Sequence, residues 1–443
     1  MARQTDRLLR KSIVGLPRPG LALVFAATVI CAAFYAAITS AILTDWPMRL
    51  LTTRGQPSCP NDAWEDGEWV KRDSPEPVLS DYEDIFAVSG FSGCNGTSEL
   101  WEHLANRDAT HWDWRARIGT YEWRPRSTGS SCQMAQFDRR EFILKLLRRG
   151  GWVMAGDSTT ETQFFSLACM LHPYVRVTPI RWEGWVWDAS WPHYLYLNTD
   201  DPWVQHLLES HVTPGFSSEA TPIVSFHRSD VLLGAHELAD IAATMSGLRQ
   251  PINYTDFWAE QYGFVMSRSS EKWISEFELK LPAGRYDTMI LSTGAYWVPG
   301  VFAGLKGDLP EILRLWRVSM TLLTARLVKV LEVIVFRSAT PGHKGCLDDL
   351  SVRNSSPLAS VPQLKEEWFN WKSLGYMNDV LEDIVLQHAH PRMKFLRLDR
   401  PGALRPDAHT LEDCLHFAVG AGVIEDWTRY IDHFVTWEID YDR

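Results

Sequence analysis

The sequence lacks the features that mark several classes of protein. Beyond residue 20 it has no stripe of clustered Lys and Arg, and 55 acidic residues against 44 basic ones give a formal charge of −11. Phosphate binding requires clustered basic side chains, so the sequence argues against a nucleic-acid partner. No cysteine pair has C-x-x-C spacing with neighbouring His, and we expect no metal site. There is no internal repeat and no low-complexity tract, and a hydrophobic content of 45% is that of a folded protein.

One uncharged segment is long enough to cross a membrane. A helix over residues 21–43, rising about 1.5 Å per residue, spans a hydrocarbon layer about 30 Å thick. Five basic residues and one acid precede it, so the positive-inside rule leaves residues 1–20 in the cytosol. We expect a signal anchor followed by a short stem at 44–58 and a lumenal remainder. The alternative is a cleaved signal peptide, whose apolar run is usually shorter.

Six cysteines follow this segment, and their even number suggests disulfides formed in an oxidising compartment. They are Cys59, Cys94, Cys132, Cys169, Cys346 and Cys414. Six cysteines allow many pairings, among which spacing alone does not choose. Glycosylation sequons at Asn95, Asn253 and Asn354 are compatible with the same secretory setting.

Tryptophan is unusually frequent, with 21 residues. Indole faces pack readily on the apolar faces of sugar rings, which makes a carbohydrate ligand worth considering. The alternative for any one of these residues is a place in the core.

The chain changes character near residue 137. Residues 59–136 are rich in Trp and Cys, and their lack of long periodic runs predicts loops and short strands. After Asp138, an N-cap residue, the run REFILKLLRR has the apolar spacing of a helix that ends at Gly150 and Gly151. We therefore expect an N-terminal region over 59–136 and a larger domain over 137–443.

Residues 152–171 predict a strand, a turn and a helix. WVMA is typical of a buried strand, GDS of a tight turn, and TTETQFFSLACML of an amphipathic helix. Short apolar runs recur at 287–293, 331–336 and 393–397, and helical patterns precede the second and third. Strands alternating with helices imply an α/β fold with a mainly parallel sheet covered on both faces. Residues 172–285 indicate only irregular structure with some short strands.

Ser158 is the first candidate for chemistry. Ligands of such sheets bind beyond the carboxyl ends of the strands, where GDS, STGAYW, RSATPGH and the loop toward DCLH are expected. A serine between a buried strand and a helix is exposed at that edge, and its backbone N–H lies where helix-terminal amides stabilise an oxyanion. The alternative is that Asp157 and Ser158 only cap the helix.

Asp413 and His416 are the second candidate pair. Side chains at i and i+3 share one face of a helical turn, so Asp413 can orient one imidazole nitrogen of His416 and leave the other as a base toward a serine. Alternatively, Thr410 to Asp413 form a capping box and His416 is a core histidine.

The order of the two motifs, strand-GDS-helix early and D-x-x-H late, resembles that of SGNH or GDSL-type hydrolases. Further segments resemble the trichome-birefringence-like family of membrane-anchored polysaccharide O-acetyltransferases, of PC-esterase type. They are CPNDAWEDGEWV (59–70), WDWR (112–115), YEWRP (121–125), CQMAQFD (132–138), STGAYW (292–297), FRSATPGH (336–343), RPDAH (405–409) and DCLHF (413–417). The resemblance runs from about residue 59 to residue 437 and is that of a divergent, fungal-like member.

This resemblance implies an SGNH-like fold, an acyl-serine intermediate at Ser158, and a catalytic triad completed by Asp413 and His416. It also implies three disulfides: Cys59 with Cys132, Cys94 with Cys169, and Cys346 with Cys414.

Four positions depart from the family pattern. Plant members usually have Arg-Asn after GDS, where this chain has Glu161 and Thr162, and the Asn and His of their N-T-G-H-W-W are Ser292 and Ala295. The oxyanion donors beyond the Ser158 N–H are therefore open, with Gly294 as a candidate. Candidate substrate contacts are Asp157, Tyr296, Trp297, Arg337, His343 and His409. The alternatives are a structural role for either histidine, an ion pair for Arg337, and core positions for Tyr296 and Trp297.

The sequence thus predicts a single-pass type II membrane enzyme of the Golgi or a related secretory compartment. It would move an acetyl or similar short acyl group onto hydroxyls of a polysaccharide or other glycan. An acyl donor such as acetyl-CoA is the expected co-substrate, with no bound cofactor. Two alternatives stay open: a glycan acetyl esterase, in which water replaces the sugar, and a non-catalytic protein that holds a cell-wall glycan through its Trp-rich loops.

Overall fold

A computed structural model of the chain describes residues 57–72, 94, 121–126, 132–178, 192–210, 212, 214–245, 267–279, 281, 284–299, 301–302, 309–346, 349, 351–353, 368–409 and 414–439. They all belong to one unit, Pro57–Arg443. The expected span at 21–43, its flanking tail and stem, the sequons at Asn95, Asn253 and Asn354, and Asp413 lie outside the described residues. Among the residues that are described, no helix is both long and apolar enough to cross a bilayer.

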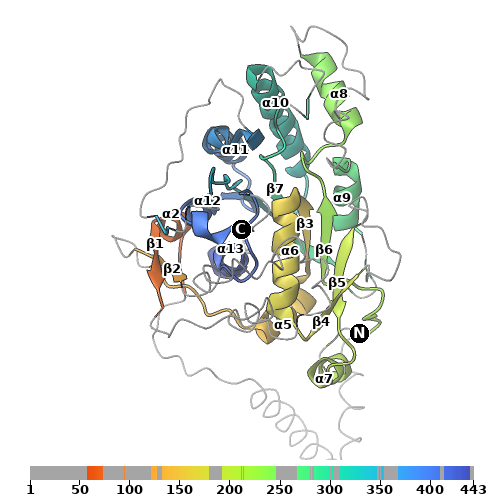
Figure 1. Ribbon diagram of the computed structural model, residues 1–443. Helices are drawn as coiled ribbons and strands as arrows, with labels where there is room; N and C mark the ends of the chain where they lie inside the picture. The colour runs from red at the N-terminus through yellow and green to blue at the C-terminus, as the bar shows by residue number, and fades with distance from the viewer. Residues whose placement is uncertain are drawn as a thin grey trace, which may run out of the picture. The chain divides into compact units, whose positions relative to one another are not determined.

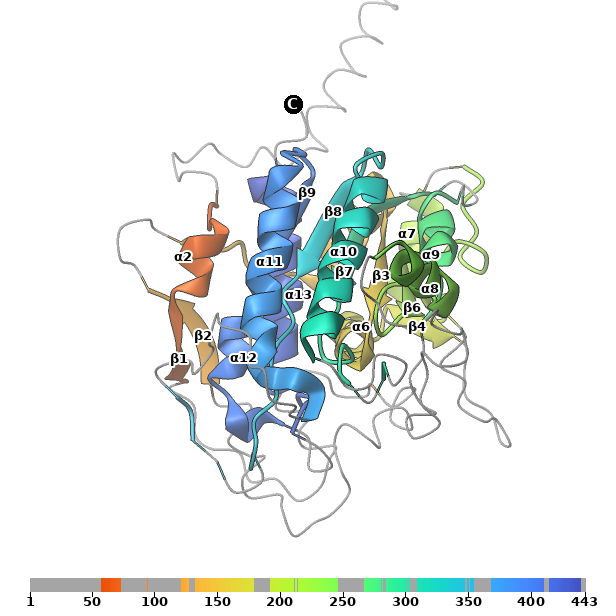
Figure 2. The ribbon, with the colours of Figure 1, turned by 90° about the horizontal axis from the view of Figure 1, so that it is seen from above.

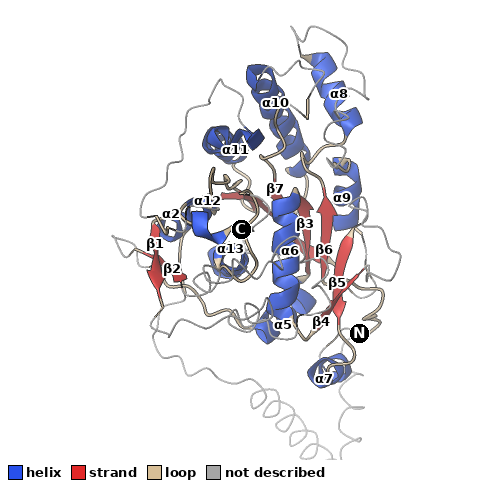
Figure 3. Ribbon diagram, in the orientation of Figure 1, coloured by secondary structure: helices blue, strands red, loops and turns tan. Residues whose placement is uncertain are grey.

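A seven-stranded sheet in the order β4-β5-β6-β3-β7-β8-β9 forms the centre of this unit (Figures 1 and 3). Strands β6, β3, β7, β8 and β9 are parallel to one another. At one side of the sheet, β5 pairs antiparallel with both β4 and β6. The bounds are β3 Gly151–Gly156, β4 Val175–Thr178, β5 His193–Leu197, β6 Val224–Arg228, β7 Tyr286–Ser292, β8 Val333–Arg337 and β9 Met393–Leu396. The prediction of an α/β fold with a mainly parallel sheet is confirmed.

Helices cover both faces of the sheet. Trp152 and Met154 of β3 belong to one core, and the alternating Val153 and Ala155 belong to the other. Figure 2 shows α10 and α11 on one side of the strands and α13 on the other. The helices are α5 Arg139–Arg149, α6 Ser158–Leu171, α7 Pro202–Ser210, α8 Ala235–Thr244, α9 Ser270–Phe277, α10 Leu309–Leu327, η8 Trp368–Ser373, α11 Leu374–Gln387, α12 Asp399–Ala403, η9 Pro406–Ala408, α13 Val423–His433 and η10 Phe434–Glu438.

Local sequence explains where α5 begins and ends. The Asp138 carboxylate accepts hydrogen bonds from the backbone N–H groups of Arg140 and Glu141, as an N-cap does. Gly150 ends the helix with φ +142°, and a Cβ there would lie 2.6 Å from the Asp287 Cβ. The predicted start at Asp138 and stop at Gly150 are both confirmed.

The region between α6 and β7 is more regular than expected. It contains β4, β5 and β6 together with α7, α8 and α9. Strand β6 escaped prediction because Ser225, His227 and Arg228 interrupt its apolar pattern, yet all three are buried. This strand pairs directly with β3, which makes it a neighbour of the candidate serine.

The N-terminal part packs through its tryptophans. Helix α2, Asn61–Glu65, precedes a two-stranded antiparallel sheet of β1, Gly67–Lys71, and β2, Tyr121–Pro125. Trp64 stacks on Tyr430 of α13, and the Trp69 indole donates to the Pro401 carbonyl at 2.9 Å. Trp64, Trp69 and Trp123 are buried, so for these three the core alternative holds.

The structure contains three disulfides, and they are the pairs that the resemblance implies. These are Cys59–Cys132, Cys94–Cys169 and Cys346–Cys414. The first two connect the Trp-rich region to itself and to α6, while the third connects the segment after β8 to the segment that carries His416.

Candidate active site

Three neighbouring strands end at the same edge of the sheet and bring polar residues together there. Gly156, the last residue of β3, pairs with Arg228 of β6 on one side and Ser292 of β7 on the other. The residues that follow these strands therefore meet, as expected for the carboxyl edge of a parallel sheet. The predicted convergence of GDS and STGAYW is confirmed.

Ser158 begins α6 directly after β3. The Asp157 carboxylate accepts from the Thr159 backbone N–H at 3.0 Å and from the Thr159 hydroxyl at 2.6 Å, so Asp157 is the N-cap of this helix. The expectation of an exposed Ser158 is wrong, because only 8% of the residue is accessible. Its Oγ lies 3.2 Å from the hydroxyl of Tyr296, which belongs to the loop after β7.

Tyr296 is connected to a buried group of charged side chains. Arg228 donates from Nη2 to Tyr296 Oη at 3.2 Å, from Nη1 to Glu161 Oε2 at 2.7 Å, and from Nε to Asp230. Glu161 Oε1 also lies 3.7 Å from His193 Nε2. One guanidinium thus contacts two carboxylates and the tyrosine beside the candidate nucleophile.

Burial and charge set the protonation of this group. Burial raises the pKa of Tyr296, and the nearby Arg228 opposes the rise without overcoming it. Burial works against the charge of Arg228, but Asp230, Tyr296 and Glu161 outweigh it and raise the pKa of Arg228 above its ordinary value. At neutral pH, therefore, Tyr296 keeps its proton and Arg228 is a cation.

Arg337 ends β8 and supports the first turn of α6. Its Nη2 donates to the hydroxyls of Thr159 and Thr160 at 3.2 and 3.3 Å, and its guanidinium lies 4.1 Å over the Trp427 ring. Burial lowers the pKa of Arg337 to about 10, against the attraction of Asp157, so the side chain is charged at neutral pH. These contacts hold the helix that begins with Ser158; the substrate contact stays a prediction.

The segment after β7 contains the remaining candidates of STGAYW. A Cβ on Gly294 would lie 2.6 Å from the Ala339 Cβ, so close packing requires the glycine. Trp297 is fully buried, and its indole donates to the Thr293 hydroxyl at 2.9 Å. Ser292 and Ala295 are also buried. These are contacts of a core, and they lend no support to a substrate contact of Trp297.

His343 and His409 form a buried pair. His343 Nδ1 lies 2.6 Å from His409 Nε2, while their outer nitrogens face the carbonyls of Ala403 and His416 at 2.9 and 3.0 Å. The pair braces the backbone at His416, which is a structural role, and its expected contact with substrate stays a prediction.

His416 lies in a segment fastened at several points. Cys414 is joined to Cys346, the Cys414 carbonyl accepts from the His343 N–H at 2.8 Å, and the Ala418 N–H donates to Ala408 at 2.8 Å. The His416 side chain is partly buried. Because Asp413 is outside the described residues, its bond to His416 and the completion of a triad with Ser158 stay predictions.

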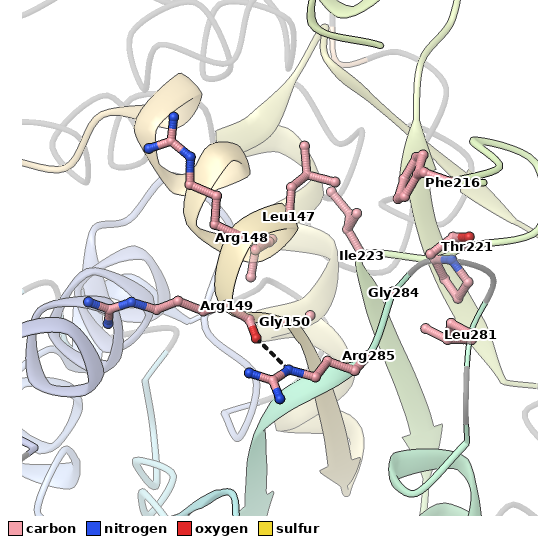
Figure 4. Close-up of a pocket in the computed structure, with 13 residues that line it drawn as sticks. Leu147, Arg148, Arg149, Gly150, Phe216, Thr221, Ile223, Leu281, Gly284 and Arg285 are labelled. Carbon is pink, nitrogen blue, oxygen red and sulfur yellow. Dashed lines mark hydrogen bonds between the residues drawn. The ribbon is translucent and has the colours of Figure 1, made fainter. Parts of the chain in front are cut away.

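A cavity of about 410 Å³ lies elsewhere, at the amino edge of the same sheet (Figure 4). Residues at the start of β3 and β7, the end of α5 and the loop before β6 line it, including Gly150, Ile223 and Arg285. Within the described part of the chain, no cluster of three or more His, Cys, Asp or Glu side chains is suited to hold a metal. The candidate site residues and this cavity thus lie at opposite edges.

The geometry at the carboxyl edge suits acyl transfer. A serine at a helix start, with a protonated tyrosine hydroxyl within hydrogen-bond distance, provides a nucleophile and a donor for developing negative charge. Sequence reasoning missed Arg228 and Asp230. The available signal was the run IVSF before His227, Arg228, Ser229 and Asp230, which is weak because polar residues interrupt the apolar pattern.

A comparison with known proteins gives one distant similarity. Over 164 residues the chain is 23% identical to Protein trichome birefringence-like 24 of Arabidopsis thaliana, which covers 36% of this chain and 33% of the plant protein. The chain thus matches about a third of the length of this curated relative. No family model matches the chain. The similarity suggests the trichome-birefringence-like family and leaves membership a proposal.

Proposed function

We propose that this protein is an SGNH-like O-acetyltransferase that moves an acetyl or similar short acyl group onto a hydroxyl of a polysaccharide. The observation that supports it most is the place of Ser158, at the carboxyl end of β3 and the start of α6, with the Tyr296 hydroxyl 3.2 Å from its Oγ. Distant similarity to a trichome-birefringence-like protein supports the same chemistry.

The proposed reaction has two steps. Ser158 Oγ attacks the acyl carbonyl carbon while His416, oriented by Asp413, takes the serine proton. The bond to the donor's leaving group breaks, His416 returns the proton to that group, and acyl-Ser158 remains. A sugar hydroxyl then gives its proton to His416 and attacks the ester, and Ser158 regains a proton as the acyl group leaves. Backbone N–H groups at the start of α6 favour negative charge at the carbonyl oxygen.

The surroundings of the reaction belong to the same proposal. A donor such as acetyl-CoA would act as co-substrate, without a bound cofactor or metal. Residues 21–43 would anchor the chain as a single-pass type II protein of the Golgi or a related membrane, with the described residues in the lumen.

The test is whether Ser158 carries the acyl group. Full-length protein in detergent, given an activated acetyl ester without glycan, should gain one acetyl mass on the peptide that contains Ser158, and acceptor glycan should remove it. Ser158→Ala should abolish this mass and lower transfer by about 10⁶-fold, because the nucleophile is lost. Its thermal unfolding should stay near that of the wild type, since one hydroxyl is deleted from the side chain.

The other outcomes separate the alternatives. Removal of the acyl group by water as fast as by glycan would indicate an esterase, because a transferase must hold its acceptor well enough to compete with water. Glycan binding by wild-type protein that is never acylated would refute the proposal and leave the non-catalytic alternative.

A further inference from the structure

We propose that Tyr296 is a catalytic residue of this acyl transfer. Its hydroxyl donates the hydrogen bond that stabilises the oxyanion at the acyl carbonyl, and Arg228 is the positioning residue that holds it. This inference rests on the proposed function, because it requires acylation of Ser158.

The direction of the hydrogen bonds supports this role. A guanidinium has only donors, so at 3.2 Å the Tyr296 oxygen accepts from Arg228 Nη2. The tyrosine proton is therefore not directed at Arg228, and Ser158 Oγ lies within its reach at 3.2 Å. The geometry therefore aims a polarised O–H group at the atom that attacks the substrate.

The same hydroxyl is placed for the oxyanion. When Ser158 Oγ bonds to the acyl carbon, the former carbonyl oxygen and Oγ are attached to one atom and lie beside each other. In the proposed transition state this oxygen is on the Tyr296 side of Oγ, where the tyrosine hydroxyl reaches it. The C=O bond of the acyl group becomes a C–O⁻ bond while the serine proton passes to His416. The Tyr296 O–H shares its proton with this oxygen and keeps it when the carbonyl re-forms and the leaving group departs.

The charges behind Tyr296 favour donation. Arg228 lies 5.7 Å from the Tyr296 ring centroid, and its Nε and Nη1 groups are bonded to Asp230 and Glu161. Arg228 and Asp230 are 5% and 0% exposed, so the guanidinium is fixed and little screened by water. A donor that itself receives a hydrogen bond from a cation becomes a stronger donor.

The first measurement is the rate of Ser158 acylation in Tyr296→Phe protein. Loss of one oxyanion donor should lower this rate by about 10²- to 10³-fold with little change in KM for the acyl donor. Tyr286→Phe is the matched control. Tyr286 is the first residue of β7, at the opposite edge of the sheet, whereas Tyr296 follows the end of the same strand. Both side chains are buried, and the Tyr286 hydroxyl contacts Ser225 and Glu276. This control should acylate at the wild-type rate.

The second measurement separates donation from mere positioning of Ser158. Acyl-enzyme formed with a ¹³C-labelled acetyl carbonyl is compared by difference infrared spectroscopy in wild-type and Tyr296→Phe protein. A hydrogen bond to the carbonyl oxygen lowers its stretching frequency, so the band should move to higher frequency in Tyr296→Phe and stay in place in Tyr286→Phe.

The outcomes are distinct. An unchanged carbonyl band in acylated Tyr296→Phe would overturn the oxyanion role while leaving the proposed function intact, and so would an unchanged acylation rate. Wild-type protein that never forms acyl-Ser158 would overturn the proposed function and this inference with it. Thermal unfolding of all three proteins shows whether the comparison is made between folded molecules.

Discussion

The arginines at the two edges of the seven-stranded sheet differ in burial and in their partners. At the carboxyl edge, Arg228 is buried and bonded to two carboxylates and a tyrosine. At the amino edge, Arg149 and Arg285 are exposed, and Arg285 donates only to the Arg149 carbonyl among the bonds drawn in Figure 4. A cavity of about 410 Å³ lies at the amino edge, away from the candidate nucleophile. Buried and paired charge is the feature that distinguishes the carboxyl edge.

The largest expected difference between the edges is in stability. Arg228→Gln should lower the free energy of unfolding by about 3–5 kcal/mol, because the buried Asp230 and the partly buried Glu161 would lose their cation. Arg285→Gln, which makes the same change at an exposed arginine, should alter it by less than about 1 kcal/mol, because its attraction for Asp287 is screened by water. Denaturant unfolding followed by circular dichroism measures both. Equal effects would contradict the contrast between the edges.

Removing each of two disulfides tests whether the carboxyl edge matters for activity. Cys346–Cys414 closes 68 residues at the segment that carries His416, and Cys94–Cys169 closes 75 residues at the far end of α6. Replacing either pair by serine should cost about 2–5 kcal/mol of stability, since both loops are long. Acylation of Ser158 per folded molecule should fall only when Cys346 and Cys414 are replaced. A comparable fall in both double variants, measured by intact-protein mass spectrometry, would show that position at the carboxyl edge is irrelevant.

The smallest expected effect is a change in the pH dependence of stability that arises from Glu65. Burial, with help from Asp399, raises the pKa of Glu65 from 4.5 to about 7. Between these values the folded state keeps a proton that the unfolded state has released, so stability falls as pH rises and levels off above about pH 7. Glu65→Gln should make the unfolding temperature less dependent on pH in this window. The exposed Glu219→Gln is the control with the same charge change, and an equal flattening in it would rule out Glu65 as the cause.

Much of the fold could be predicted because its signals are local. The apolar runs of β3, β7 and β8 are short and uninterrupted, that of β9 is interrupted only by Lys394, and Asp138 and Gly150 delimit α5. Strand β6 could not be predicted in this way, because buried polar side chains such as Arg228 weaken its pattern. Arg228 can be buried because residues from other segments hydrogen-bond to it. Those residues are distant in sequence, so no local pattern contains them.

For the candidate site, local sequence was sufficient to place Ser158 between a strand and a helix, and capping by Asp157 was the alternative to its expected substrate contact. Tyr296 lies 138 residues from Ser158 and 68 from Arg228, and the three meet only because β6 and β7 flank β3. Strand order depends on long-range pairing and on which faces the helices bury, which periodicity does not encode. The tertiary structure alone therefore decided that Ser158 is buried, that a tyrosine hydroxyl is its neighbour, and that an arginine stands behind that tyrosine.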